Sequence, residues 1–245
     1  PYIHHELGFH YYEAGRYALA IRELGSAIAH LILPSQKKQK ADALNFLGVA
    51  YYEQGNIDQA VFNWLKGLSS DPDNSVLQSN LAIAYIERQD LERGIGELEK
   101  VVAKNPSDIS ALSNLGAAYL KAKKQEKAVD VLARALEKKK ANISAERAVD
   151  SGGKKMAKLA EEIPESAIRA NLGAAYLDLK RLPDALQELQ KAKELDPQNY
   201  SVLVNLSQVH LQLSQYDQAV QMVEQALRLK KEDPYLYAFL GQAYT

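Results

Sequence analysis

The sequence predicts an all-α protein in which antiparallel helix pairs stack side by side as a solenoid. Three observations lead to this fold class. A short phrase of Leu, a small residue and Tyr recurs at a fixed spacing, a second pattern of small residues follows each copy, and glycine or proline stands where helices would turn or end. One helix pair cannot bury its own apolar face, so units of this kind must stack on one another.

The first helix of each unit is marked by a phrase such as Leu115-Gly116-Ala117-Ala118-Tyr119. Its small second residue recurs at positions 8, 48, 82, 116, 173, 207 and 241. The steps between these positions are 40, 34, 34, 57, 34 and 34 residues, so two steps are longer than the other four. Leu, the small residue and Tyr at i, i+1 and i+4 lie on one helical face. We therefore expect one repeated helix per unit, with two insertions between units.

The second helix of each unit is marked by a small residue about twelve positions later, at Ala20, Ala60, Gly94, Ala128, Ala185 and Ala219. Small side chains let two antiparallel helices approach closely. Gly15 and Gly55 permit a tight turn between the helices of a pair. Prolines end the second helix in three units, at Pro72, Pro106 and Pro197.

This pattern resembles that of the tetratricopeptide repeat (TPR) family over nearly the whole chain. The resemblance implies a single domain, 1–245, that forms a right-handed α-solenoid, a superhelix whose first helices line a concave groove. The predicted full repeats are 1–34, 41–74, 75–108, 109–142, 166–199 and 200–233, and residues 234–245 begin a seventh. Ser207 and His210 weaken the motif in the sixth repeat.

The two insertions are expected to differ in structure. Residues 33–40 fit a solvated loop or a lengthened helix. The insertion 143–165 begins in a helix that starts near Glu126 and meets no breaker before Ser151, a length of about 36 Å. Apolar residues then recur at helical spacing from Met156 to Ile163, which predicts a helical hairpin. The hairpin either packs on a neighbouring helix or serves as a partner-docking element or groove lid.

Composition and charge exclude several classes of function. The chain has 30 basic and 31 acidic residues, which disfavours general nucleic-acid binding through phosphate contacts. Cysteine is absent, so disulfides, Cys-ligated zinc and thiol nucleophiles are excluded. No apolar run approaches the ~18 residues of a membrane span, so direct membrane insertion is not expected. The chain begins at Pro1 rather than Met, so a trimmed targeting segment is compatible with it, and a soluble protein of cytoplasm or periplasm is expected.

No motif predicts catalysis. His5-Glu6 and His10 are one residue out of step with the H-E-x-x-H zinc motif. Gly94-Ile95-Gly96 lacks a third glycine and a preceding strand, so it is not a dinucleotide-binding loop. We therefore predict no catalytic residue, no metal, no cofactor and no enzymatic activity.

A ladder of asparagines is the most informative polar pattern. The residue two before the small position is Asn in four consecutive repeats, namely Asn80, Asn114, Asn171 and Asn205. Asn is a mediocre helix former, so its recurrence there needs a reason. A carboxamide both donates and accepts, so it can bond the backbone of an extended peptide. Peptide-binding TPR proteins, including the O-GlcNAc transferase and kinesin light chain families, carry asparagine at this position. The alternative is that each Asn satisfies groups within or between its own repeats.

Further residues are predicted to line the groove around the ladder. Their shared feature is a position on the same face of the first helices: Asn45, Ser79, Ser113, Ile83, Ala117, Ala174, Glu87 and Lys121. Glu13, Glu53 and Asp178 add acidic charge to the rim. The expected ligand is extended and partly apolar, with basic residues.

The sequence therefore predicts a non-catalytic protein–protein interaction module or scaffold that binds an extended peptide segment of a partner protein. Two alternatives remain open. One is an assembly scaffold that self-associates into a homo-oligomer through Tyr237, Leu240, Gly241 and Tyr244. The other is the substrate-recruiting domain of a larger enzyme.

Overall fold

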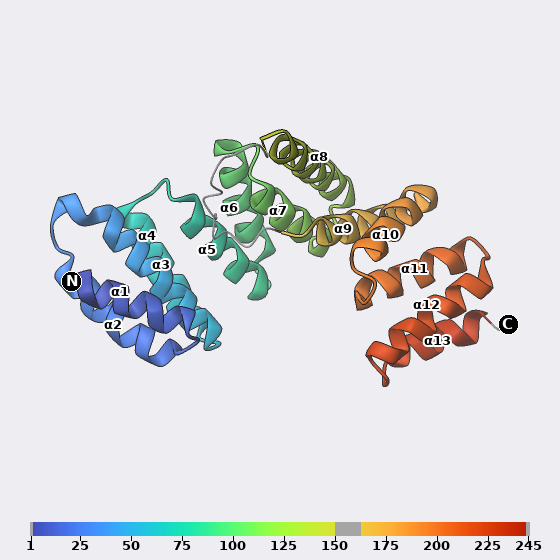
Figure 1. The fold of residues 1–245 in the computed structure, drawn as a ribbon, viewed down its shortest axis with the longest axis horizontal. Coiled ribbons are helices and arrows are strands. Elements are labelled where there is room, and N and C mark those ends of the chain that lie inside the picture. The colour runs from blue at the N-terminus through green and yellow to red at the C-terminus, as the bar shows by residue number, and fades with distance from the viewer. Residues whose placement is uncertain (1, 150–162, 244–245) are drawn as a thin grey trace. The chain divides into compact units, whose positions relative to one another are not determined.

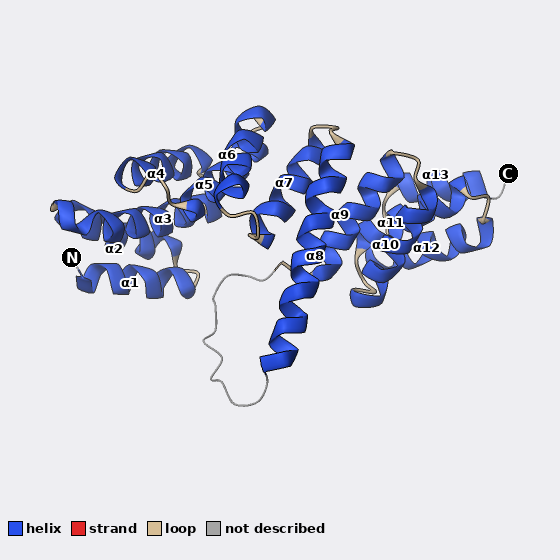
Figure 2. Cartoon of the chain, turned by 90° about the horizontal axis from the view of Figure 1, so that it is seen from above, coloured by secondary structure: helices blue, strands red, loops and turns tan. Residues whose placement is uncertain are grey.

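The computed structural model describes residues 2–149 and 163–243, and every regular element within them is a helix (Figures 1 and 2). This confirms the predicted all-α class of antiparallel helix pairs. The chain divides into two compact units, Pro1–Asn105 and Pro106–Thr245, and each is considered by itself. The predicted second helix of the hairpin, from Met156 onward, falls mostly in 150–162 and lies outside the described residues.

The first unit contains three helix pairs. They comprise α1 (Tyr2–Glu13) with α2 (Tyr17–His30), α3 (Lys37–Glu53) with α4 (Ile57–Ser70), and α5 (Ser75–Glu87) with α6 (Leu91–Lys104). The first helices of neighbouring pairs also touch, α1 against α3 and α3 against α5. Residues 33–40 form the short 3-10 helix η1 (Pro34–Gln36) and the lengthened start of α3. The insertion thus extends the first helix of the second repeat.

The second unit follows the same order. Its elements are α7 (Ile109–Lys121), α8 (Gln125–Val149), α9 (Glu165–Asp178), α10 (Leu182–Leu195), α11 (Tyr200–Gln212), α12 (Tyr216–Leu229) and α13 (Pro234–Ala243). Helix α9 packs on both α7 and α8, and α11 packs on α9. The insertion that begins within α8 therefore leaves the first helices on either side of it, α7 and α9, in contact.

The close approach of the two helices in a pair depends on the small position. A Cβ added at Gly116 would lie 2.4 Å from Cγ of Leu132, which belongs to the paired helix. In the sixth repeat, Ser207 stands at the small position and the residue sixteen further on is the shorter Val223. Ser207 is fully buried, and its Oγ donates to the carbonyl of Val204 at 2.7 Å. A smaller partner side chain and an internal hydrogen bond thus accommodate the departure from the motif.

The turn between the helices of each pair uses one left-handed residue at a constant repeat position. The two glycines there are Gly15 and Gly55, with φ of 68° and 77°. The other turns have non-glycine residues with φ of 55–64°, at Gln89, Lys123, Lys180 and Ser214. The left-handed region costs a residue with a Cβ about 1–2 kcal/mol.

Replacing Lys123 with Gly is therefore expected to raise the free energy of unfolding by about 0.5–1 kcal/mol. The gain is smaller than the relieved strain because glycine also increases the entropy of the unfolded chain. Denaturant unfolding followed by circular dichroism measures the difference. The matched control is Gly55→Ala, which should change the stability in the opposite direction. A destabilised Lys123→Gly protein would contradict the assignment of strain to this turn.

Candidate functional site

Three of the predicted ladder residues lie on consecutive first helices of the second unit. Asn114 is on α7, Asn171 on α9 and Asn205 on α11, and these helices touch in that order. Each asparagine is half-buried. Within residues 2–149 and 163–243, none of the three carboxamides has a hydrogen-bond partner. The row thus presents donors and acceptors that are free to bond a ligand.

The fourth ladder residue, Asn80, has an internal partner. Its Nδ2 donates to Oδ1 of Asn45 on α3 at 2.8 Å, and both residues are half-buried. The bond joins the first helices of neighbouring repeats, α3 and α5. Asn80 therefore contributes at least in part to the contact between repeats, as the alternative interpretation of the ladder proposes.

The other predicted groove residues differ in their access to solvent. Glu87 and Lys121 are exposed, and four are half-buried: Ser79, Ile83, Ala117 and Ala174. Ser113 is only 4% exposed, and its Oγ is buried with no hydrogen-bond partner in the described part of the chain. Ser113 is thus placed in the packed interior rather than on an open surface.

The acidic residue Glu87 is tied to a neighbouring repeat. The hydroxyl of Tyr52 on α3 donates to Glu87 at the end of α5. Burial of the phenol, and then this contact with the carboxylate, raise the pKa of Tyr52 above its usual value. This pair was not predicted from the sequence, because it joins residues 35 positions apart in different repeats.

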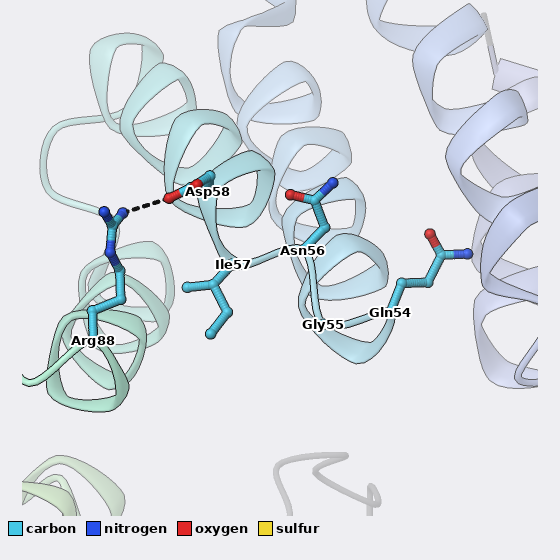
Figure 3. A pocket seen from close by; sticks show the side chains of 6 residues that line it. All are labelled: Gln54, Gly55, Asn56, Ile57, Asp58 and Arg88. Carbon is cyan, nitrogen blue, oxygen red and sulfur yellow. Dashed lines mark ion pairs between the residues drawn. The ribbon is translucent and has the colours of Figure 1, made fainter.

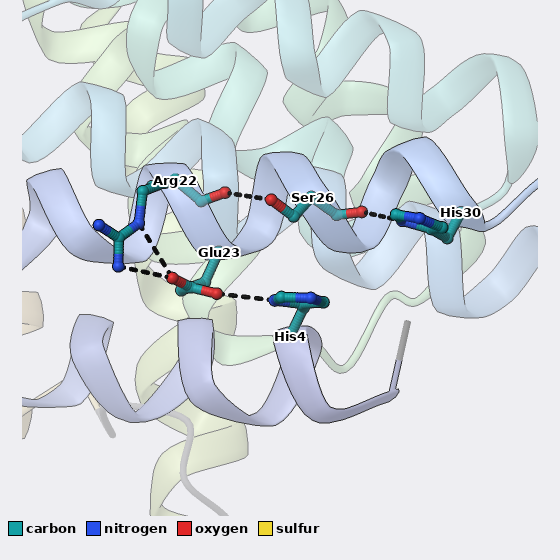
Figure 4. Close-up of polar contacts among 5 residues, drawn as sticks. All are labelled: His4, Arg22, Glu23, Ser26 and His30. Carbon is teal, nitrogen blue, oxygen red and sulfur yellow. Dashed lines mark hydrogen bonds and ion pairs between the residues drawn. The ribbon is translucent and has the colours of Figure 1, made fainter.

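In some repeats, a hydrogen bond or ion pair between side chains also links the two helices of the pair. His4 on α1 is hydrogen-bonded to Glu23 on α2 at 2.7 Å, and Arg22 donates to the same carboxylate from Nε and Nη2 (Figure 4). The bond to His4 and then that to Arg22 lower the pKa of Glu23. In the fifth repeat the same two repeat positions carry Arg169 and Glu188, which form an ion pair. Charged residues 19 positions apart were the signal that could have predicted these ties.

A polar hollow of about 520 Å³ lies beside the turn between α3 and α4 (Figure 3). Residues 54–58 and Arg88 line it. The guanidinium of Arg88 is paired with a carboxylate, because its Nη1 lies 2.8 Å from Oδ1 of Asp58. The arrangement joins the α3–α4 turn to the end of α5 and carries no feature of a reaction centre.

The described residues contain neither a metal-binding cluster nor a membrane-spanning helix. None of their His, Asp and Glu side chains gather in a group of three or more that could hold a metal ion. None of their helices is both long and apolar enough to cross a bilayer.

Comparison with family models settles the identity of the repeats. Models of the tetratricopeptide repeat match residues 5–75, 79–143, 144–200 and 176–243, which together cover most of the chain. The chain belongs to the tetratricopeptide repeat family. Members of this family generally serve as interaction modules. No curated protein matches the sequence.

Solved TPR structures share the fold. The APC/C hetero-tetramer Cut9–Hcn1 matches 99% of this chain with a TM-score of 0.76 at 17% identity, and this chain spans 42% of the length of its counterpart. PilF of Pseudomonas aeruginosa matches 85% of this chain and 86% of its own, with a TM-score of 0.68 at 20% identity. MamA of Desulfovibrio magneticus matches 79% of this chain and 97% of its own, with a TM-score of 0.61 at 18% identity. At these identities the likeness concerns the fold alone.

Proposed function

We propose that this TPR protein is a non-catalytic scaffold that binds an extended peptide segment of a partner protein. Asn114, Asn171 and Asn205 bond the peptide backbone, one asparagine per repeat. The proposal is carried by the free, half-buried carboxamides of these residues on three helices that touch in sequence. Such an array binds backbone groups, which every peptide presents, and leaves sequence specificity to neighbouring side chains.

The space beside the ladder suits a peptide. Ala117 and Ala174 lie one turn after Asn114 and Asn171 on the same helical face, and both are half-buried. Their small side chains leave room for a ligand chain close to the helices. Three net hydrogen bonds of ~0.5–1.5 kcal/mol each supply only a few kcal/mol, so side-chain contacts must provide the remaining affinity.

The comparisons support a role in binding protein partners. Cut9, a TPR chain of similar fold, is part of a hetero-tetramer with Hcn1. The fold alone does not choose a partner, because unrelated functions share the TPR architecture. The partner's chemistry has to be inferred from the side chains around the ladder.

Replacing Asn114, Asn171 and Asn205 together with Ala is expected to weaken peptide binding at least about tenfold, because the three backbone hydrogen bonds are lost. Peptides are first selected on the native chain from a random peptide library. Their affinity for the native chain and for the variant is then measured by isothermal titration calorimetry. Helicity should stay unchanged, because the three side chains make no internal hydrogen bond among the described residues.

The matched control removes three carboxamides from the second helices, with Gln187, Gln190 and Gln221 replaced by Ala. These side chains are exposed on α10 and α12, so the affinity should not change. Equal binding by the native chain and the asparagine variant would contradict the proposal. That result would favour binding at another surface, such as α13. There Tyr237 is 57% exposed, and a Cβ added at Gly241 would meet no described atom within 4 Å.

A further inference from the structure

A second feature of the first unit lies where α1, η1 and α3 meet. A pocket of about 310 Å³ opens there. The residues that line it come from both sides of the insertion between the first two repeats: Tyr2, His5, Glu6, Leu31, Gln36, Gln39 and Asp42.

The pocket occupies the ladder position of the first repeat. Glu6 stands two residues before Gly8, which is the repeat position of the ladder asparagines, and His5 stands at the repeat position of Asn45. Asn45 in turn is the hydrogen-bond partner of Asn80. The pocket is therefore found at the repeat positions that we propose for peptide binding, with a carboxylate in place of a carboxamide.

The pocket carries unbalanced negative charge. Glu6 and Asp42 line it, and no Lys or Arg is among the lining residues. Asp42 is half-buried, and its carboxylate has no hydrogen bond or ion pair with any other described residue. Burial raises the pKa of Asp42, while the charges of Lys38 and His5 act in the opposite direction. A carboxylate that loses water without gaining a partner is unfavourable, so a cation that enters the pocket is favoured.

The neighbouring side chains offset this charge only in part. His5 Nδ1 lies 3.7 Å from the carboxylate of Glu6, which is a loose contact, and its Nε2 is buried without a hydrogen-bond partner in the described residues. Lys38 is exposed and makes no described ion pair with Asp42. His5, Glu6 and Asp42 do not form a group able to hold a metal ion among the described residues. These observations favour an organic cation.

We propose that this pocket binds the guanidinium group of an arginine side chain of a partner protein. A guanidinium is planar and presents five N–H donors, which suits the two carboxylates and two carboxamides around this cavity. Its flat face can also stack on an aromatic ring, and Tyr2 at the rim is 73% exposed. The inference goes beyond the proposed function, because the pocket belongs to the first unit and the asparagine ladder to the second.

The test uses two small probes, N-acetylarginine methylamide and its neutral citrulline counterpart of nearly the same shape. Each is titrated into the ¹⁵N-labelled full chain and followed by NMR. The arginine probe should shift the amide signals of Tyr2–Glu6 and Gln39–Asp42, and the citrulline probe should not. Asp42→Asn and Glu6→Gln should each weaken arginine binding about tenfold or more, as expected for loss of a hydrogen bond to a charged group.

The matched control is Glu92→Gln, because Glu92 is an exposed carboxylate on α6 of the same unit, outside the pocket and the first helices. It should leave arginine binding unchanged. Equal binding of the citrulline probe, or arginine binding that survives Asp42→Asn, would overturn the assignment of a guanidinium site.

The triple variant of Asn114, Asn171 and Asn205 separates this inference from the proposed function. These residues belong to the other unit, so the variant should bind the arginine probe like the native chain. If it also binds the selected peptides normally, the ladder proposal fails while the arginine pocket stands. If the native chain ignores the arginine probe but the triple variant loses peptides, only the pocket fails.

Discussion

Replacing Arg169 with Ala is expected to lower the free energy of unfolding of the second unit by about 3–5 kcal/mol. The side chain of Arg169 is only 6% exposed, and its guanidinium contacts both Glu165, through Nε at 2.7 Å, and Glu188. Glu188 is 13% exposed and Glu165 21%. Without Arg169, two carboxylates remain close together in a largely dry environment with little compensating charge.

Denaturant unfolding measured by circular dichroism checks this value. The chain itself offers a control, because the same two repeat positions in the fourth repeat carry Leu112 and Val131, which are both buried. The double variant Arg169→Leu/Glu188→Val should therefore recover most of the lost stability.

A second control separates burial from charge. Arg181 pairs with Asp184 on the surface, where both side chains are about half exposed. Arg181→Ala should cost less than about 1 kcal/mol. If Arg169→Ala lowered the free energy of unfolding no more than Arg181→Ala does, the ion pair between Arg169 and Glu188 would not stabilise the packing of α9 on α10.

The second large effect is expected in the first unit, at Trp64. Trp64→Ala should destabilise it by about 3–5 kcal/mol, because the indole is 2% exposed and leaves a large cavity. A Cβ added at Gly48 on α3 would lie 2.3 Å from the indole nitrogen. The same nitrogen donates to the carbonyl of Asn45 at 3.3 Å, so the ring joins α4 to α3 by packing and by a hydrogen bond.

Thermal and denaturant unfolding of two further variants test the assignment. Trp64→Leu should be less harmful than Trp64→Ala, because Leu occupies this repeat position in other repeats, as at Leu24 and Leu132. Phe62→Ala on the same helix should change stability by less than about 0.5 kcal/mol, because Phe62 is 59% exposed. Equal losses from Trp64→Ala and Phe62→Ala would contradict the packing described.

The helices could be predicted from the sequence because their signals are local. Leu, a small residue and Tyr share one helical face wherever they recur, and proline stops the second helix in three repeats. The turns were predictable only in part. Gly15 and Gly55 indicate a left-handed residue, whereas Lys123 and Lys180 adopt the same conformation without any such signal. Their conformation is imposed by the packing of the two helices that they join.

The repeat positions predict which residues belong to the candidate site. They do not predict which of these side chains already have hydrogen-bond partners within the protein. Asn80 and Asn114 stand at equivalent repeat positions. Asn80 has a hydrogen-bond partner because the preceding repeat supplies the carboxamide of Asn45. Ser113 was predicted on the groove surface, but the packing around α7 buries its hydroxyl. Contacts between repeats depend on which residues face each other across two helices, and periodicity alone does not determine them.

The proposed function requires that the side chains of Asn114, Asn171 and Asn205 bond the backbone of a peptide. The most direct measurement compares a selected peptide with versions methylated at single backbone nitrogens, using both the native chain and the Asn114/Asn171/Asn205→Ala variant. Methylation removes one N–H donor while leaving the peptide's side chains in place. The ladder predicts that methylation at some positions weakens binding to the native chain but has little further effect on the variant. Equal losses on both proteins, or no loss at any position on the native chain, would contradict it.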